Sequence, residues 1–350
     1  MLFFIFKRLL AGILVSISVI IIVSSIIYLA PVDPTRLTFG QRSDDSTITA
    51  KREALGLDKP LYVQMLYYIR DISPLVFSSN PNYIASARFV KKRISLGETK
   101  LLIKSPDLRD SFQSARSVAS ILREVIPLTV LLAFCSLFIA TILGILFGFI
   151  AAINKDKFFD TTLVAVSTLG YSVPSYVSAI ILAIIFGYLL SDVTGLRMQG
   201  SLYELNDIGD PYLALRNIVL PSIALGIRPI SVITQISRSA ILDTLSQDYV
   251  RTAVAKGVQF KNVLKKHVFK NSMNPVISVV SGWLASLLTG AFFVEYVFSY
   301  KGLGYTTVTA LLNYDIPVIL GSLLFVSIVF VFLNITVDIL YKAIDPRENF

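Results

Sequence analysis

The chain has 350 residues, of which 54% are hydrophobic and only 16% are charged, whereas about 25% of the residues of a soluble domain are charged. This composition predicts a membrane protein. One cysteine, Cys135, and one histidine, His267, leave no readable disulfide, zinc hydrolase or Ser/His/Asp site, so catalysis is not expected. The net charge of +9 is a guide to topology first, because Lys and Arg between spans orient a membrane protein.

Six stretches have the length of a spanning helix, since about 20 mainly apolar residues cross the hydrocarbon core at helical rise. They are Leu9–Leu29, Pro127–Ile153, Thr162–Leu190, Ile218–Ile236, Pro275–Phe298 and Pro317–Ile339. The first follows Lys7 and Arg8 as a signal peptide would, but it is too long and lacks a small-residue cleavage pattern before Pro31. The expected fold is therefore all-α: a polytopic membrane protein with six transmembrane helices.

Basic residues near the span ends predict the orientation, because positive charge in a short loop resists translocation. One side holds thirteen of them: Lys7, Arg8, Lys155, Lys157, Arg238, Arg251, Lys256, Lys261, Lys265, Lys266, Lys270, Lys342 and Arg347. The other side holds Arg197, Arg216 and Lys301. We therefore expect both termini to be cytoplasmic. Residues 31–123 then lie outside despite fifteen basic residues, since long segments cross largely regardless of charge.

This topology divides the chain into an N-terminal transmembrane helix (1–30), an extracytoplasmic segment (31–123) and a transmembrane domain (124–347). The outer segment contains two expected short helices, Ala50–Leu55 and Leu61–Ile72. The second has an apolar face of Leu61, Met65, Leu66 and Ile69. That face fits the membrane edge, a neighbouring subunit or packing within the segment. No regular element is predicted from Ser78 to Ser117.

The inner loop at 238–274 is the one cytoplasmic loop long enough to hold structure. Ser246 is a candidate N-cap for a helix with Asp248 in its first turn and Gly257 as its stop. Two apolar stripes at helical spacing follow: Tyr249, Val250, Ala253 and Val254, then Phe260, Val263, Leu264 and Val268. Lysines occupy the rest of the second stretch, so we expect a basic, two-part amphipathic hairpin.

Two interpretations of this hairpin are open. Its helices fit the membrane interface, where anionic lipid attracts lysines. They also fit a groove on a cytoplasmic partner, because a helix docked in a groove transmits motion to the spans on either side. The pattern alone does not choose between them.

The hairpin also resembles a known family. Asp248–Gly257, followed by His267–Asn271 and Pro275-Val276, resembles the coupling loop of ABC importer permeases, and Arg251 is similar to the arginine that commonly opens this motif in the dipeptide/oligopeptide/nickel branch. Other stretches resemble that branch in the same order: Ala54–Leu61 with Val63-Gln64, Gly170–Pro174, Phe293–Phe298, Gly302–Gly304, Asp315–Pro317, and Asp338 with Asp345–Arg347. Lys301, where the branch usually has proline, and Val254, where it often has arginine, depart from it.

The resemblance implies a permease subunit in the lipid of a bacterial inner membrane, paired with a second homologous subunit or a second copy of itself. It also implies two cytoplasmic ATPase subunits and an extracytoplasmic substrate-binding protein. The sequence has no Gly-x-x-x-x-Gly-Lys-Ser/Thr loop, so ATP and magnesium are expected on the ATPase subunits, with no cofactor in this chain and no nucleic acid. The residues implied in ATPase coupling are Asp248, Tyr249, Arg251, Thr252, Ala253, Gly257, His267 and Asn271.

Polar and helix-bending residues within the spans are candidates for the substrate pathway, because such positions are costly in a membrane. They are Gly170, Ser172, Pro174, Arg228, Asn334 and Asp338. Arg228, which with Pro229 is expected to interrupt the fourth span, fits either attraction of a peptide carboxylate or a structural pair with an acid. Asn334 and Asp338 also fit interfacial or interhelical hydrogen bonds, and Glu295 fits an exit-side gate or the interface.

The expected function is import of a dipeptide or oligopeptide by alternating access, driven by ATP hydrolysis on partner subunits. Nickel, glutathione and an antimicrobial peptide are alternative cargos. The alternative from another class is an ATP-independent secondary transporter, which would need intramembrane carboxylates for ion coupling and often has an internal repeat. Neither feature is clear in the sequence.

Overall fold

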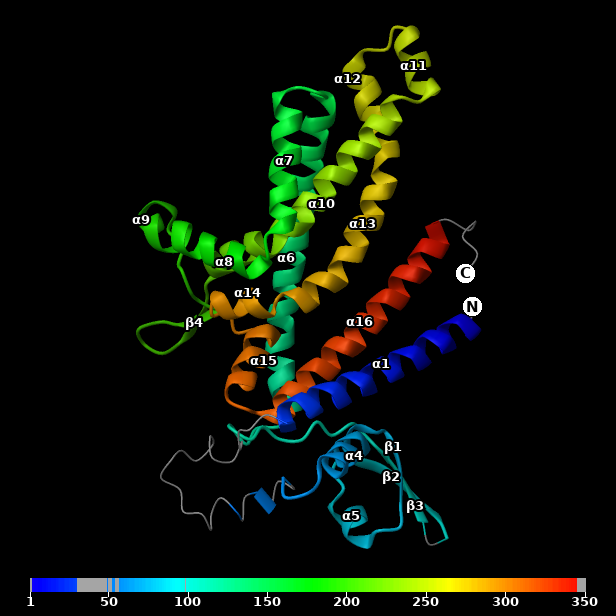
Figure 1. Ribbon diagram of the computed structural model, residues 1–350, viewed down its shortest axis with the longest axis vertical. Coiled ribbons are helices and arrows are strands. Elements are labelled where there is room, and N and C mark those ends of the chain that lie inside the picture. The colour runs from blue at the N-terminus through cyan, green and yellow to red at the C-terminus, as the bar shows by residue number, and fades with distance from the viewer. Residues whose placement is uncertain (1, 30–48, 50–51, 54–56, 98, 345–350) are drawn as a thin grey trace. The chain divides into compact units, whose positions relative to one another are not determined.

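A computed structural model describes residues 2–29, 49, 52–53, 57–97 and 99–344 (Figure 1). The chain divides into two compact units. The first unit is Met1–Val125 with Thr306–Val331, and the second is Ile126–Tyr305 with Phe332–Phe350. The short helix expected at Ala50–Leu55 lies mostly outside the described residues.

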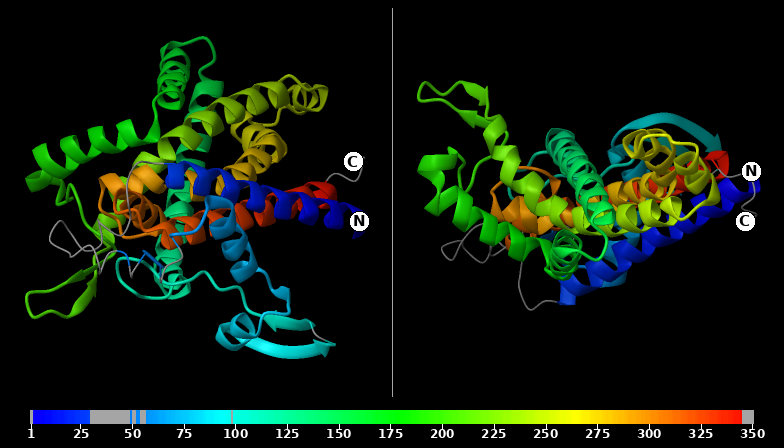
Figure 2. Two further views of the ribbon diagram at one scale, coloured as in Figure 1. Left: turned by 60° about the horizontal axis from the view of Figure 1, so that its bottom comes forward. Right: turned by 90° about the horizontal axis from the view of Figure 1, so that it is seen from above.

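Helices α1 (Leu2–Leu29) and α16 (Ile316–Ile344) run side by side in the first unit (Figures 1 and 2). The hydroxyls of Ser16 and Ser327 lie 3.1 Å apart across this contact. Small residues and interhelical hydrogen bonds are common means by which helices associate in lipid. A helix as apolar as α1 therefore has a defined partner within its own chain.

Helix α4 (Leu61–Ile72) has the bounds that the sequence predicts. The predicted apolar face is only partly buried: Leu66 is 60% exposed, while Gln64 and Tyr68 are the buried side chains. Gln64 is accommodated because its amide donates a hydrogen bond to the Lys59 carbonyl at 2.7 Å, which satisfies the group locally. The buried face of α4 thus carries polar groups as well as apolar ones.

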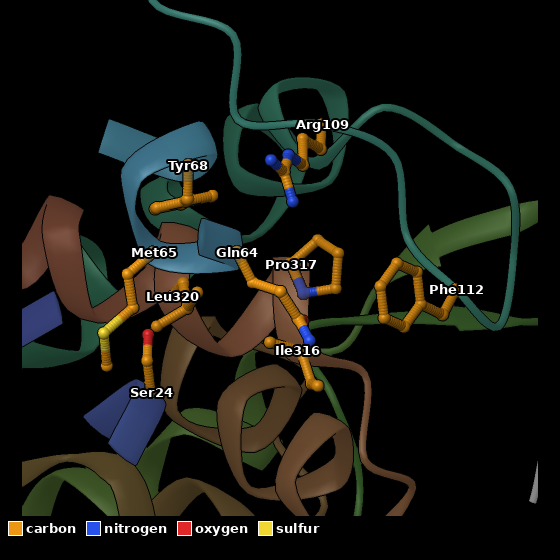
Figure 3. Close-up of a pocket in the computed structure, with 9 residues that line it drawn as sticks. All are labelled: Ser24, Gln64, Met65, Tyr68, Arg109, Phe112, Ile316, Pro317 and Leu320. Atoms are coloured by element: carbon orange, nitrogen blue, oxygen red, sulfur yellow. The ribbon is translucent and has the colours of Figure 1, made fainter. Parts of the chain in front are cut away.

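Figure 3 shows this face of α4 around a cavity of about 10 Å³. Ser24 of α1, Arg109 of the following loop, and Pro317 and Leu320 of α16 also line the cavity. Its volume is about that of one water molecule. The described part of the outer segment therefore packs on the first and last long helices of its own unit.

A small antiparallel sheet lies in the region for which no regular element is predicted. Its strands are β1 (Leu75–Ser78), β2 (Val90–Leu96) and β3 (Thr99–Lys104), in the order β1-β3-β2, with helix α5 (Pro81–Ser86) between β1 and β2. Val76, Ile84 and Leu102 form its core. The period-two pattern of β2 is hidden because the register shifts between Val90 and Lys92, and such a bulge breaks the alternation.

The chain after this sheet is tied to the start of α16. The Asp315 carboxylate, which is 4% exposed, accepts hydrogen bonds from the Ser111 hydroxyl and from the Phe112 backbone N–H, the latter at 2.9 Å. Helix α15 (Leu303–Leu312) precedes this corner. The aspartate of the Asp315–Pro317 stretch therefore has a structural role in the first unit.

The second unit is built around helix α10 (Val219–Leu245). Helices α7 (Phe158–Ser172), α8 (Ser175–Ile184) and α13 (Phe269–Gly290) pack against it. Helix α6 (Val118–Ile153) approaches closely because Gly148 has no side chain: a Cβ atom there would lie 2.5 Å from Ser237 Cβ. The unit also contains a π-helical turn (Ile185–Leu189), α9 (Ser191–Thr194), the strand pair β4 (Tyr203–Leu205) and β5 (Pro211–Leu213), a 3-10 turn (Leu215–Ile218) and α14 (Phe292–Val297).

Within the described residues, three helices are long and apolar enough to cross a membrane: Val118–Ile153, Leu215–Leu245 and Ile316–Thr336. A fourth span results if Phe158–Ser172 and Ser175–Leu189 count as one, bent by 107°. The region Leu10–Ile26 is a shorter apolar helix. The helical fold class is confirmed, and the count of six spans stays a prediction.

Two of the predicted spans differ from the structure. The third is not one continuous helix, because Val173 is extended (φ −78°, ψ 129°), as the residue before a proline tends to be. The fourth is not interrupted at Arg228 and Pro229, since α10 runs through both. Proline inside a helix is tolerated where neighbouring groups satisfy the freed backbone.

Candidate functional site

The predicted hairpin is present at the end of α10 and α13 that is far from α14 (Figure 1). It consists of α11 (Asp248–Ala255), α12 (Phe260–Val263) and a π-helical turn (Leu264–Val268). The prediction that Ser246 caps α11 is wrong. Because α10 extends to Leu245, Ser246 closes that helix and donates to the Asp243 carbonyl at 2.7 Å, and Gln247 precedes α11 without a side-chain cap.

Gly257 ends α11 in the left-handed conformation, with φ +78°. Its N–H donates to the Val254 carbonyl at 2.9 Å, and the Val258 N–H donates to the Ala253 carbonyl at 3.3 Å. Among the described residues no heavy atom lies within 4 Å of a Cβ placed at Gly257. Glycine is therefore favoured here by backbone conformation and not by space.

Three of the four valines of the two apolar stripes face the body of the second unit. Val250, Val263 and Val268 are buried in one cluster with Ala152 of α6 and Ile241 of α10. Leu264 is half-buried against the same cluster, whereas Tyr249, Val254 and Phe260 are 43%, 48% and 54% exposed. The hairpin thus has an inner apolar face that fixes it and, among the described residues, three large apolar side chains that stay largely exposed.

The polar residues implied in coupling fall into two groups. The Asn271 amide donates to the Tyr249 hydroxyl at 2.9 Å, which joins α11 to the start of α13. Asp248 and Arg251 are exposed, and their charged groups lie 3.9 Å apart, so the pair adds little stability. Thr252 bonds within its own helix, and His267 is half-buried in the π-helical turn.

Some of the predicted pathway residues meet where the third span breaks. Gly170 permits contact between α7 and α10, since a Cβ there would lie 2.6 Å from the Ser231 hydroxyl. The Arg228 guanidinium lies over the neighbouring Tyr171 ring, 5.2 Å from its centroid. Its buried Nε has no hydrogen-bond partner among the described residues. A partly satisfied cation therefore lies beside the bend that Pro174 produces.

The structure does not bring the remaining predicted pathway residues, Ser172, Asn334 and Asp338, to one described site. Ser172 is exposed and donates to the Thr168 carbonyl within α7. Asn334 is half-buried in α16, apart in sequence from the bend. The side chain of Asp338 lies outside the described part of the molecule. The structure thus brings Gly170 and Arg228 together at the α7–α10 contact.

Glu295 holds the loop that follows α14. Its side chain is fully buried, and Oε2 accepts hydrogen bonds from the N–H groups of Gly304 at 2.8 Å and Tyr305 at 3.1 Å. Thr129 of α6 accepts from the Leu303 N–H at 2.7 Å. A Cβ at Gly302 would lie 2.5 Å from both side chains. Gly302 is therefore required by the close approach of the backbone to Glu295 and Thr129, and Gly304 by its approach to the backbone of Phe292.

Comparison with known proteins decides the family. The model for the binding-protein-dependent transport system inner membrane component matches residues 144–349, and the model for the N-terminal part of such components matches residues 1–133. The chain belongs to this family. It is thus a transport permease of the ABC class, as the resemblance in its motifs indicates.

Relatives of this permease match along its whole length. The dipeptide transport system permease protein of Haemophilus influenzae is 31% identical over 98% of this chain and 98% of its own. The di/tripeptide transport system permease protein of Pseudomonas aeruginosa is 31% identical over 99% and 98%. An inward-facing structure of the MetNI methionine ABC transporter, at 14% identity, matches 65% of this chain and 97% of its own with a TM-score of 0.51, which supports the fold.

One element of the permease was missed by the sequence analysis. Asp160, in the first turn of α7, accepts hydrogen bonds from Arg238 near the end of α10, with Arg238 Nη2 2.7 Å from Oδ2. The Asp156 N–H donates to the same carboxylate at 2.9 Å. The pair is bidentate and nearly buried at Asp160, a strong geometry. In the sequence Arg238 is only one more basic residue beside a span, and no local signal links it to a residue 78 positions away.

Proposed function

We propose that this permease imports short peptides through the inner membrane of a bacterium, with ATP hydrolysed on two cytoplasmic ATPase subunits. A second permease subunit, homologous or identical, and an extracytoplasmic substrate-binding protein complete the proposed assembly. The names of the full-length relatives support a peptide cargo. The excess of Lys and Arg beside the hairpin supports cytoplasmic termini.

The observation that carries the coupling role is the two-sided hairpin. If the hairpin were an interfacial anchor, its apolar stripes would face lipid and would not be buried within the protein. Instead Val250, Val263 and Val268 pack on the permease, which makes the hairpin a firm extension of α10 and α13. Tyr249, Val254 and Phe260 then form an apolar surface suited to a groove on the ATPase. The groove interpretation is therefore favoured over the lipid one.

The other members of the coupling set take supporting roles in this proposal. Gly257 sets the turn, Asn271 orients Tyr249, and Ala253 lies half-buried below the exposed surface. Asp248, Arg251 and Thr252 are exposed on α11, and His267 is half-buried in the π-helical turn. The pathway proposal keeps Gly170, Ser172, Pro174, Arg228, Asn334 and Asp338, with Arg228 as the group that attracts a peptide carboxylate.

Reconstitution tests this function. Proteoliposomes with the complete transporter should take up labelled trialanine only with ATP and the binding protein, and this chain alone should not. Uptake by the chain alone without ATP would favour the secondary transporter. ATP-dependent uptake of nickel without any uptake of peptide would overturn the assignment of peptide as the cargo.

Surface substitutions separate the two interpretations of the hairpin. Val254→Glu with Phe260→Glu should remove the ATPase from the purified complex, while Lys261→Ala with Lys265→Ala and Lys266→Ala should keep it. Loss of the ATPase only in the lysine variant would refute the groove interpretation.

A further inference from the structure

A recess of about 890 Å³ lies in the second unit. Its lining includes residues of strand β4, which Figure 1 shows far from the hairpin helices α11 and α12. Two loops line it, the chain from Arg197 to Tyr212 and the turn that contains Ser299 and Lys301. Hydrogen bonds join the loops: the Gly200 N–H donates to the Phe298 carbonyl at 2.9 Å, and the Lys301 N–H donates to the Ser201 hydroxyl at 3.2 Å. The walls are therefore preorganised.

Glu204 stiffens the first wall. Its carboxylate accepts hydrogen bonds from the Tyr212 hydroxyl at 2.7 Å, the Asn217 amide at 2.8 Å and Arg197 at 3.0 Å. The Tyr212 hydrogen bond is the main cause that holds the pKa of Glu204 below its ordinary value. The charges of Glu204 and Arg197 thus pair with each other within the wall.

The second wall is the turn that Glu295 and Thr129 hold against α6. Tyr300 of this turn is fully buried, and its hydroxyl donates to the Leu128 carbonyl at 3.2 Å. Ser299 has φ +52°, a strained conformation that persists only where surroundings enforce it. Lys301 is therefore presented from a fixed backbone.

Two charged side chains of the recess have no charged or hydrogen-bonding partner among the described residues. Lys301 and Asp207 are both exposed, and neither side chain forms an ion pair or hydrogen bond with any described residue. They come from different loops, one cationic and one anionic. Tyr203, 58% exposed, offers a ring between polar groups of the lining.

The size of the recess limits what fits. The volume of the recess, about 890 Å³, lies within the roughly 300–1,000 Å³ of sites that take small ligands, and an extended peptide spans about 3.3–3.6 Å per residue. Two or three residues, about 7–11 Å, fit within it. We infer that this recess binds a zwitterionic di- or tripeptide, with its carboxylate at Lys301 and its ammonium group at Asp207.

This inference rests on the proposed function, since the peptide cargo is part of it and its topology places the recess on the outer side. A recess on the outer side would receive peptide before it enters the spans. The alternative occupant is an acidic loop of the binding protein, and the experiment separates the two.

The complete transporter in nanodiscs, without binding protein, is titrated with trialanine by saturation-transfer NMR. An exposed ion pair contributes up to about 1 kcal/mol, so Lys301→Ala and Asp207→Ala should each weaken trialanine binding by up to about fivefold, and together more. Trialanine with both termini blocked should bind weakly to all forms. Lys100→Ala, an exposed lysine of β3 outside the recess, is the control and should bind as the wild type.

Three results would overturn the inference: no trialanine binding, equal binding by all variants, or variants that change only the affinity for the binding protein. ATP-dependent trialanine uptake is measured in parallel with the binding protein present. If the wild type takes up trialanine but trialanine does not bind in the recess, the inference about the recess is refuted and the proposed function is not. Absence of uptake refutes the proposed function, whatever the binding result.

Discussion

Substitution of Gly257 is a sensitive test of the coupling hairpin. The residue has φ +78°, and among the described residues no heavy atom lies within 4 Å of the position that a Cβ atom would take there. A substitution at Gly257 therefore acts through backbone strain alone. Asparagine tolerates the left-handed region, alanine is strained by about 1 kcal/mol, and β-branched valine is strained most.

The structure limits the size of the effect. A strain of about 1 kcal/mol lowers the fraction of correctly turned hairpin by up to about fivefold, and the apparent affinity for the ATPase falls by the same factor. We expect the affinity for the ATPase to fall in the order wild type, Gly257→Asn, Gly257→Ala, Gly257→Val. Gly257→Asp should lie near asparagine in conformation but also adds a negative charge beside the docking surface.

Binding of purified ATPase subunits to the permease in nanodiscs measures this order, with ATP-dependent uptake as the second readout. Gly195 provides a matched control, because it has φ +66° and equally open surroundings but lies after α9, outside the hairpin. The same substitutions at Gly195 should leave ATPase affinity unchanged. Equal affinity across the Gly257 series, or the same order at Gly195, would refute the reasoning.

Three further predictions concern the second unit. Asp160→Asn removes the carboxylate that binds Arg238, so the free energy of unfolding in detergent should fall by about 2 kcal/mol, while Lys155→Ala, at an exposed site, should change it little. Gly302→Ala should abolish the yield of folded permease, because its Cβ would meet Glu295 and Thr129 at 2.5 Å, whereas Gly282→Ala, with open surroundings in α13, should be neutral or stabilise by up to about 1 kcal/mol. Glu204 has a lowered folded pKa, so its stabilisation of the β4–β5 pair is present above the unfolded value of 4.5 and is lost as pH falls through the folded value. Protection factors of the β4 and β5 amides, which are exchange rates corrected for the intrinsic rate at each pH, should fall in acid in the wild type, and Glu204→Gln should remove that pH dependence.

Local patterns in the sequence were sufficient for the elements whose cause is local. Hydropathy located the long apolar helices, Pro60 located the start of α4, and Gly257 located the stop of α11, because each depends on residues within one or two turns. The motif at 248–271 indicated the permease family in the same way. Helix content and family were therefore predictable from the chain alone.

The candidate site was predictable only in part. Periodicity grouped Val250 with Tyr249 on one apolar side of α11, but it carries no information on which of them contacts α6 and α10. The structure buries Val250 and exposes Tyr249. That division is what distinguishes a docking surface from a lipid anchor, and it arises from packing between helices far apart in sequence.

Several features of the fold depend on contacts between residues far apart in the chain. Asp160 meets Arg238 across 78 positions, and Asp315 meets Ser111 across 204. The 107° bend after Ser172 has a local cause in Pro174, but its size depends on where α8 packs against α10. Local sequence patterns are sufficient to locate the long helices and to indicate the family. The tertiary structure decided which faces are buried, because burial is set by neighbours that no local pattern identifies.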